Sequence, residues 1–314
     1  METISLGTSS LNASRLAYGC WRIAGPGETS EITPERLAAA ERAVIAAFEA
    51  GYTLFDHADI YCHGEAERIF GKAIGTVPGM RDRILIASKC GIRKAGDADP
   101  ESPYRYDFSA GHIIWSCEQS LKRLGVERID LFMLHRPDYL CDPEEVAQAF
   151  TRLKQSGKVA EFGVSNFMPA QLASLQKACS MRLLVNQVEI SLAKLDCFHD
   201  GTLAHCSMEC ITPMAWSPLG GGRLGASDPI DLRDPDHARR LHIREVLDLI
   251  ARARDTTRPV VALAWLLKHP AKILPIVGST DPERIREMTR AVDVHLNRDE
   301  WYRLLEAGLG HRLP

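Results

Sequence analysis

An alternation of short apolar runs with longer amphipathic runs, repeated eight times, constrains this chain more than any other feature of its sequence. The apolar runs predict strands over 16–18, 53–55, 84–87, 131–134, 162–164, 183–185, 213–216 and 273–276. Strands that are apolar on both faces and separated by helices are typical of a parallel sheet, and eight such units close a barrel. The sequence therefore predicts an α/β fold, a (β/α)8 TIM barrel that forms a single domain over 1–314.

Signals for helix starts lie between the predicted strands. Thr33 supplies an N-cap, Pro34 occupies the first helical position and Glu35 adds an acid to the first turn. The same opening recurs at 142–145 and 281–283. Residues 3–6 and the short segment after them predict an N-terminal β-hairpin, and 297–300 open an extra C-terminal helix. No stretch has the composition of an interdomain linker, which agrees with one barrel.

Composition and charge exclude several classes of protein. The 38 Lys and Arg residues nearly balance the 41 Asp and Glu residues, so neither a nucleic-acid binder nor a membrane-surface protein is expected. The first residues lack the basic and apolar regions of a signal peptide, and no apolar run approaches the ~20 residues of a membrane helix. The nine cysteines include no CxxC pair and predict reduced thiols. We expect a cytoplasmic protein, as a monomer or a small homo-oligomer.

A glycine-rich run at 220–225 brings in a second fold class. It matches GxGxxG, the fingerprint of a doubly wound dinucleotide-binding fold, and a predicted strand precedes it. In that fold a helix starts inside the fingerprint, whereas here Asp228, Pro229 and Asp231 follow, and these residues favour a loop. The barrel is therefore favoured over the doubly wound sheet.

Polar residues follow the predicted strands, at the end of a barrel where functional groups lie. Taken one at a time, each has a structural explanation: Asp56 as a loop-capping acid, Lys89 as a solvated charge and His135 as a residue satisfied within a turn. These three follow successive strands at the same edge, so we expect them to lie together. The full set at the strand ends is Trp21, Arg22, Asp56, Tyr61, Lys89, His135, Ser165, Asn166, Gln187, Glu189, Ser217 and 278–280.

Five of these segments carry a family resemblance. FDHADIY at 55–61, ASK at 87–89, DLFMLH at 130–135, GVSNF at 163–167 and NQVE at 186–189 resemble, in combination and order, the signature segments of the aldo-keto reductase superfamily. The run at 216–222 looks particularly like a bacterial branch of predicted NADP-dependent oxidoreductases. The resemblance implies a reductase that transfers hydride between NADP(H) and the carbonyl of a small aldehyde or ketone.

The resemblance implies a catalytic tetrad of Asp56, Tyr61, Lys89 and His135. Carbonyl reduction creates an alkoxide, so a proton donor must lie within hydrogen-bond reach. A phenol with a pKa near 10 is a poor acid at pH 7 unless a cation favours its ionised form. We expect Lys89 to lower the pKa of Tyr61, Asp56 to hold Lys89 charged, and neutral His135 to orient and polarise the carbonyl.

The resemblance also implies a cofactor site. Side chains after the fifth and sixth strands would bind the nicotinamide carboxamide, Trp216 would stack on the ring, and N–H groups of the glycine-rich loop would cover the pyrophosphate. Residues 278–287 would hold the adenosine phosphate and adenine. Gly278 and Met288 depart from the basic residue and Asn of many members, so NAD(H) stays open as an alternative. The members are Trp21, Ser165, Asn166, Gln187, Trp216, Ser217, Leu219, Gly220, Gly222, Gly278, Ser279, Thr280, Arg284 and Glu287.

Substrate recognition and the competing functions are less specific in sequence. Trp21, the loop 93–108 with Tyr104 and Tyr106, and the turn 136–139 either surround the mouth of the barrel or pack as loops. The short tail at 308–314 predicts an open mouth and broad acceptance of aldehydes. Two alternatives remain: a Schiff-base lyase that uses Lys89, and a cofactor-sensing regulatory subunit of the same fold. Neither cluster of His and Cys, at 57–63 or 199–210, has the spacing of metal ligands, so no metal site is expected.

Overall fold

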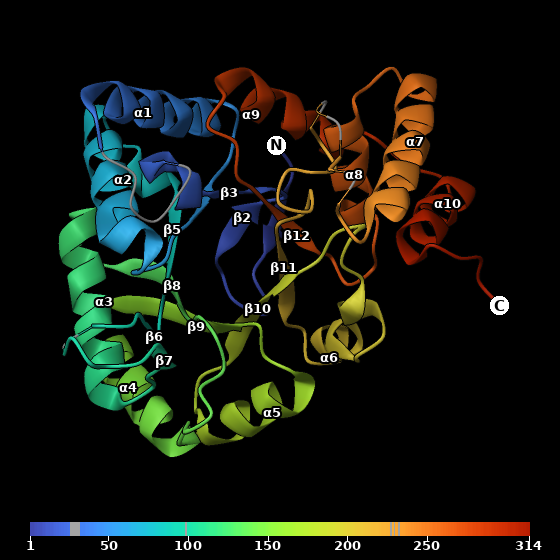
Figure 1. Ribbon diagram of the computed structural model, residues 1–314. Coiled ribbons are helices and arrows are strands. Elements are labelled where there is room, and N and C mark those ends of the chain that lie inside the picture. Colours follow the sequence, from blue (N-terminus) through green and yellow to red (C-terminus); the bar gives the residue numbers. More distant parts are fainter. Residues whose placement is uncertain (26–31, 98, 227, 229, 232) are drawn as a thin grey trace.

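The computed structural model describes residues 1–25, 32–97, 99–226, 228, 230–231 and 233–314. Its centre is a closed barrel of eight parallel strands, each of which matches a strand predicted from the sequence (Figure 1). In barrel order the strands are β3 (Ala17–Gly19), β4 (Leu54–Asp56), β5 (Leu85–Cys90), β8 (Ile129–Leu134), β9 (Val159–Ser165), β10 (Leu183–Glu189), β11 (Thr212–Trp216) and β12 (Leu274–Val277). The TIM-barrel prediction is confirmed.

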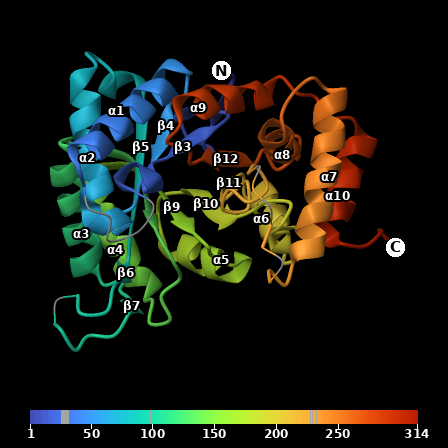
Figure 2. The same cartoon turned by 45° about the horizontal axis from the view of Figure 1, so that its top comes forward.

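The helices form an outer layer around the barrel. α7 packs against α10 on the side of the barrel formed by the later strands (Figures 1 and 2). The α-helices are α1 (Pro34–Glu49), α2 (Glu65–Thr76), α3 (Ala110–Leu124), α4 (Pro143–Gln155), α5 (Pro169–Ala178), α6 (Thr202–Met208), α7 (His237–Ala253), α8 (Arg258–Leu267), α9 (Pro282–Met288) and α10 (Arg298–Leu309). Short 3-10 helices are η1 (Cys20–Ala24), η2 (Tyr61–Gly64), η3 (Arg81–Arg83), η4 (Asp196–Phe198) and η5 (Thr289–Val292).

The predicted helix starts are confirmed by their caps. The side chains of Thr33, Asp142 and Asp281 accept backbone N–H groups at the starts of α1, α4 and α9. Asn297 and Glu300 form a capping box at the start of α10, the extra C-terminal helix. After the glycine-rich run the next helix, α7, begins at His237, so no helix starts inside the GxGxxG match. This connection is that of a barrel, not of a doubly wound sheet.

Two hairpins accompany the barrel. β1 (Thr3–Ser5) pairs with β2 (Asn12–Ser14), as the sequence predicted, and the adjacent Leu6 and Ala13 are buried with the barrel interior. β6 (Ile92–Arg93) pairs with β7 (Arg105–Tyr106) after β5, across the segment 93–108 that the sequence predicts as a loop. The first hairpin belongs to the core, whereas the second extends the loop that follows Lys89.

Alternation along the strands determines which side chains enter the barrel. Residues that belong to the interior apolar cluster include Leu54, Ala87, Val185 and Met214. Because successive strand residues point to opposite faces, the residue two positions further along points to the same interior, nearer the carboxyl end. Those residues are Asp56, Lys89, Gln187 and Trp216. The interior therefore changes from apolar to polar at the end where the strands finish.

Three further observations concern membranes, thiols and metals. No helix among the described residues is long and apolar enough to cross a membrane. All nine cysteines are free thiols, and most are buried. In the described part of the chain, no three His, Cys, Asp or Glu side chains lie together in a way that could hold a metal ion.

Candidate active site

Lys89 lies at the centre of the site, fully buried at the end of β5. Its Nζ donates to both carboxylate oxygens of Asp56, at 2.9 and 2.8 Å, and to the carbonyl oxygen of His57 at 2.6 Å. The Tyr61 hydroxyl lies 3.3 Å from the same Nζ. The ring of His135 packs edge-on against the ring of Tyr61, with centroids 6.0 Å apart. The structure thus brings together the four residues that the family resemblance assigned to a tetrad.

The charge of Lys89 depends on its partners. Burial alone would lower the pKa of the Lys89 ammonium, but the attraction of Asp56 and Tyr61 outweighs burial and raises it above its ordinary value. A buried cation is costly unless it is paired and hydrogen-bonded. The contacts to Asp56 and His57 meet that condition, so Lys89 is held charged in the interior.

The acid strength of Tyr61 differs from the sequence-based expectation. Burial raises the pKa of the Tyr61 phenol, and the charge of Lys89 only partly opposes this effect. The expected contribution of Lys89 has the correct sign, but the expected net decrease in pKa is wrong. The reason is burial, which a sequence does not display, so the phenol is held in its protonated form.

His135 is neutral, as the sequence predicted. Burial and then the charges of Lys89 and Arg136 lower the pKa of its imidazole well below the ordinary value. Its backbone N–H donates to the carbonyl of Cys90 at 2.9 Å, which anchors the loop after β8 to β5. Among the described residues, Nδ1 of this buried ring has no hydrogen-bond partner. A neutral imidazole can offer one N–H as a donor.

The side chains assigned to the nicotinamide carboxamide meet one another. Ser165 Oγ donates to the backbone carbonyl oxygen of Gln187 at 2.8 Å, and Trp216 Nε1 donates to Asn166 Oδ1 at 2.9 Å. Gln187 Nε2 donates to Asp56 Oδ1 at 2.7 Å, an interaction that sequence reasoning missed. Gln187 therefore contacts the predicted tetrad through Asp56, and the cofactor roles of these side chains remain predictions.

The glycine-rich loop has the backbone that its composition permits. Ser217, Gly220, Gly221 and Gly222 all have positive φ angles, a region that glycine enters without steric cost. The N–H groups of Gly220 and Gly222 donate within the loop, whereas those of Leu219 and Gly221 have no partner among the described residues. Arg22 on η1 reaches across the mouth to the Gly221 carbonyl at 3.4 Å. The loop thus lies over the mouth and leaves two amides for a ligand.

The region assigned to the adenosine end is open. A Cβ added at the exposed Gly278 would meet no atom within 4 Å. The Arg284 side chain is 72% exposed, with its Nε 3.6 Å from Asp281 Oδ2. Ser279 is held through its carbonyl by the Tyr18 hydroxyl at 2.8 Å. The other two members are exposed Thr280 and half-exposed Glu287. Met288, in contrast, is buried in the core against the helices.

Aromatic side chains gather on the loops around the mouth. Trp21 is 48% exposed on η1 and carries the Arg22 guanidinium 5.5 Å from its ring centroid. Tyr106 contacts Tyr104 and also Tyr139, with centroids 6.0 and 6.4 Å apart. The sequence allowed these rings either to surround the mouth or to pack within the loops. In the structure they pack against one another and are also partly exposed.

A second layer of buried polar contacts lies behind the tetrad, and sequence reasoning missed it. Ser116 Oγ on α3 donates to Asp59 Oδ2 at 2.6 Å, and burial raises the pKa of Asp59 to about 7. Glu67 accepts hydrogen bonds from Ser88 Oγ at 2.6 Å and Arg123 Nε at 2.7 Å. The available signal was an acid, Glu67, on the apolar face of a predicted helix. These contacts tie the segment that carries Tyr61 to β5 and α3.

The turn after Tyr61 has an unusual backbone. Cys62, His63 and Gly64 have φ angles of 47°, 54° and 85° in succession. L-residues enter this left-handed region at a cost of about 1–2 kcal/mol each. The Asp59 N–H, which donates to the Lys89 carbonyl at 3.0 Å, fixes the chain just before this turn. Two non-glycine residues in this conformation next to the Tyr61 phenol are consistent with a conformation imposed by the site.

Comparisons with known proteins agree with this geometry. The sequence model of the Aldo/keto reductase family matches residues 15–308. The chain is 40% identical to 6-dehydroglucose reductase of Novosphingobium aromaticivorans, over 98% of this chain and 96% of that protein. It is also 40% identical to 6-dehydroglucose reductase of Agrobacterium fabrum, over 99% of both chains. A solved thermostable aldo-keto reductase in complex with the inhibitor epalrestat is 26% identical, with a TM-score of 0.82 over 98% of this chain and 100% of that one. The chain belongs to the aldo-keto reductase family of oxidoreductases.

Proposed function

We propose that this chain uses NADPH to reduce the carbonyl group of a small aldehyde or ketone, with Tyr61 as the general acid. The observation that carries the proposal is the buried ammonium of Lys89, which contacts Asp56 at 2.8 Å and the Tyr61 hydroxyl at 3.3 Å. Titratable groups with perturbed pKa values that meet at the carboxyl end of a barrel are typical of an active site.

The residues divide the proton chemistry among them. The nicotinamide supplies the hydride when it is bound. Hydride addition to the carbonyl carbon leaves a negatively charged oxygen, which takes the proton from Tyr61 Oη. The resulting phenolate is stabilised by the Lys89 ammonium, which Asp56 keeps charged. Neutral His135 donates a hydrogen bond to the carbonyl oxygen as charge develops on it. In the reverse direction the phenolate takes the proton back from the alcohol.

Several residues of this chain fit a dinucleotide. Trp216 presents a half-exposed aromatic ring at the mouth, and Leu219 and Gly221 offer two N–H groups for the pyrophosphate. The exposed guanidinium of Arg284, only loosely held by Asp281, can pair with a 2′-phosphate. This guanidinium supports NADP(H), while the missing basic side chain at Gly278 keeps NAD(H) as the alternative.

The relatives support a sugar-derived carbonyl among the substrates. Two proteins at 40% identity, which cover nearly the whole chain, have the name 6-dehydroglucose reductase. That name describes a sugar that carries an additional carbonyl group. A hydroxylated aldehyde is therefore the first substrate class to test.

The decisive experiment compares Tyr61→Phe with the unmodified chain. We expect kcat for aldehyde reduction to fall by about 100-fold or more, because general-acid catalysis contributes about that much, while NADPH binding stays within about twofold. Turnover is measured from the absorbance of the reduced nicotinamide, and NADPH binding is measured from fluorescence quenching on the same preparation. Tyr302→Phe, on exposed α10, is the matched control. Near-normal turnover by Tyr61→Phe would refute the assignment.

The same assays separate the two alternative functions. NADPH binding without turnover across a panel of aldehydes and ketones would favour a regulatory subunit. Borohydride trapping of a substrate adduct on Lys89 would favour a Schiff-base lyase. The structure argues against the lyase, because a Lys with a raised pKa is charged and a poor nucleophile.

A further inference from the structure

Two oppositely charged side chains at the mouth of the barrel are half-buried, and neither forms a hydrogen bond or an ion pair within the described part of the chain. Arg136 directly follows His135, and its guanidinium lies 5.3 Å from the centroid of the Trp216 ring. Glu189 is the last residue of β10. Among the residues that the structure describes, neither charged group takes part in a hydrogen bond or an ion pair. Burial raises the pKa of the Glu189 carboxyl, against the attraction of Lys194 and Arg136.

The strand geometry places both groups above the tetrad. Glu189 stands two residues beyond Gln187, which contacts Asp56, so Glu189 points to the same interior face one level nearer the mouth. In the register of the barrel, Glu189 is the neighbour of Trp216, the residue whose ring Arg136 covers. Arg136 and Glu189 therefore border the space through which a carbonyl must pass to reach Tyr61 and His135.

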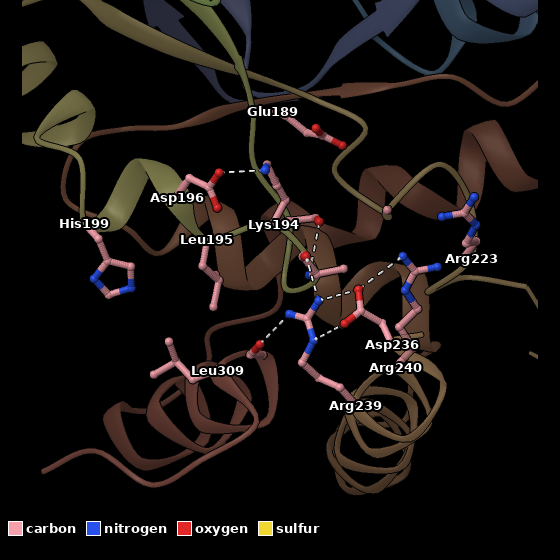
Figure 3. Close-up of a pocket in the computed structure, with 14 residues that line it drawn as sticks. Glu189, Lys194, Leu195, Asp196, His199, Arg223, Asp236, Arg239, Arg240 and Leu309 are labelled. Carbon is pink, nitrogen blue, oxygen red and sulfur yellow. Dashed lines mark hydrogen bonds and ion pairs between the residues drawn. The ribbon is translucent and has the colours of Figure 1, made fainter. Parts of the chain in front are cut away.

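Glu189 also lines a polar cavity of about 470 Å³ beside the mouth (Figure 3). The cavity lies between the loop after β10, the glycine-rich loop, the start of α7 and the end of α10. Most of its charges are paired: Lys194 with Asp196 at 2.6 Å, and Arg239 with Asp236 at 2.9 Å. Leu195 and Leu309 also line the cavity, but most of its lining residues are charged or polar, so the cavity continues the polar surface from Glu189 outward.

The chemistry of the two side chains specifies the ligand. A guanidinium only donates hydrogen bonds and a carboxylate only accepts them. An anionic ligand would satisfy Arg136 but be repelled by Glu189. A cationic ligand would satisfy Glu189 but be repelled by Arg136. A hydroxyl group accepts from the first and donates to the second, so a neutral ligand with several hydroxyls satisfies both.

We propose that Arg136 and Glu189 are specificity-determining residues that bind hydroxyl groups of a polyhydroxylated carbonyl substrate, whose carbonyl reaches Tyr61 and His135 and whose remainder extends toward the cavity. This inference rests on the proposed function. Polar groups built to bind a substrate hydroxyl discriminate against the analogue that lacks it, because they are then left without a partner. Water can still reach half-exposed side chains, so we expect discrimination of about tenfold to a hundredfold, below that of a fully buried site.

The test compares glyceraldehyde with propanal, which has the same carbon chain without hydroxyls. The unmodified chain should have a kcat/KM at least about tenfold higher for glyceraldehyde. Arg136→Met and Glu189→Leu should each remove most of this preference by raising KM for glyceraldehyde. In both variants kcat/KM for propanal should stay within about threefold of its value in the unmodified chain. Glu189→Gln keeps an acceptor oxygen and should retain part of the preference. Arg42 is an exposed cation on α1, and Arg42→Met is the control. This variant should leave kcat/KM for both substrates unchanged.

The outcomes separate the two levels of inference. Turnover of propanal without a preference for glyceraldehyde would overturn the role of this pair. Equal losses of kcat/KM on both substrates in the variants would do the same. Either result leaves the proposed reductase function intact. A stronger preference for glyceraldehyde 3-phosphate overturns the neutral-polyol assignment. Absence of turnover with either carbonyl overturns the proposed function, and the pair with it.

Discussion

Asp59→Asn should remove a pH-dependent cost to stability that this fold carries beside its active site. Asp59 is largely buried, and Ser116 Oγ donates to its Oδ2 at 2.6 Å. Its other oxygen, Oδ1, has no partner in the described part of the chain. Desolvation therefore dominates and raises the pKa of Asp59 to about 7, with a smaller contribution of the same sign from Glu67.

The magnitude follows from the difference between folded and unfolded chains. An Asp in an unfolded chain has a pKa of about 3.9, and one pKa unit corresponds to about 1.4 kcal/mol. Between pH 4 and pH 7 the folded chain keeps the proton on Asp59 while the unfolded chain loses it. The free energy of unfolding must then fall as the pH rises through this range, by about 4 kcal/mol in total, and level off above pH 7. Asn has no titrating proton, so the Asp59→Asn variant should not show this decrease in the free energy of unfolding.

The assay is urea unfolding of both proteins from pH 5 to pH 8. The stability of Asp59→Asn relative to the unmodified chain should increase by about 3 kcal/mol over that range, with most of the change below pH 7. Asp293→Asn, at an exposed position, is the control and should show no such trend. Ser116→Ala removes the hydrogen bond that favours the carboxylate and should extend the trend to higher pH. Stability curves of Asp59→Asn and the unmodified chain that run parallel across pH would refute the reasoning.

Three further predictions test the site and its support. Lys89→Met should abolish turnover and lower the free energy of unfolding by about 3–5 kcal/mol at pH 7, measured in urea, because Asp56 becomes a buried charge without its cation; an unchanged stability would contradict this. Gly278→Arg should tighten NADPH by about tenfold over NADH in fluorescence titrations, since the position is open and the new contact is charge-assisted; unchanged NADPH affinity would show that the phosphate lies elsewhere. Gly71→Ala should destabilise the fold, because its Cβ would lie 2.5 Å from the Leu124 carbonyl oxygen, whereas Gly75→Ala in the same helix should stabilise it by up to about 1 kcal/mol in thermal unfolding; equal effects would refute the steric argument.

The sequence was sufficient for the strands, helix starts and tetrad because local chemistry determines them. Thr33, Asp142 and Asp281 cap helices through N–H groups two or three residues away, and a strand end determines where Lys89 stands. The contacts that were missed join distant segments: Gln187 and Asp56 are 131 positions apart, and Ser116 and Asp59 are 57 apart. Strands of two residues, β6 and β7, are too short to produce a periodic pattern.

The pKa of Tyr61 illustrates a different limit. Its neighbour Lys89 was predictable from the family resemblance, and so was the direction of its effect. Desolvation of the phenol was not, because it depends on how the loop after β4 is covered by η1, α3 and the loop after β8. Likewise, nothing in Cys62 indicates a left-handed backbone, since most residue types other than glycine seldom adopt it. Burial and tertiary strain are properties of the packed chain and have no counterpart in a motif.

Depth along the barrel axis separates the residues that we propose for catalysis from those that we propose for substrate recognition. At the level of Gln187 and Lys89, side chains are buried and fully engaged with one another, so their geometry is set before a substrate arrives, as chemistry requires. One level nearer the mouth, Glu189 and Arg136 are half-exposed, and neither forms a hydrogen bond or ion pair with the residues that the structure describes. Under our proposal, they exchange water for substrate hydroxyls. A variant at the deeper level should therefore reduce kcat for every carbonyl alike. A variant at the mouth should instead change KM for one substrate relative to another.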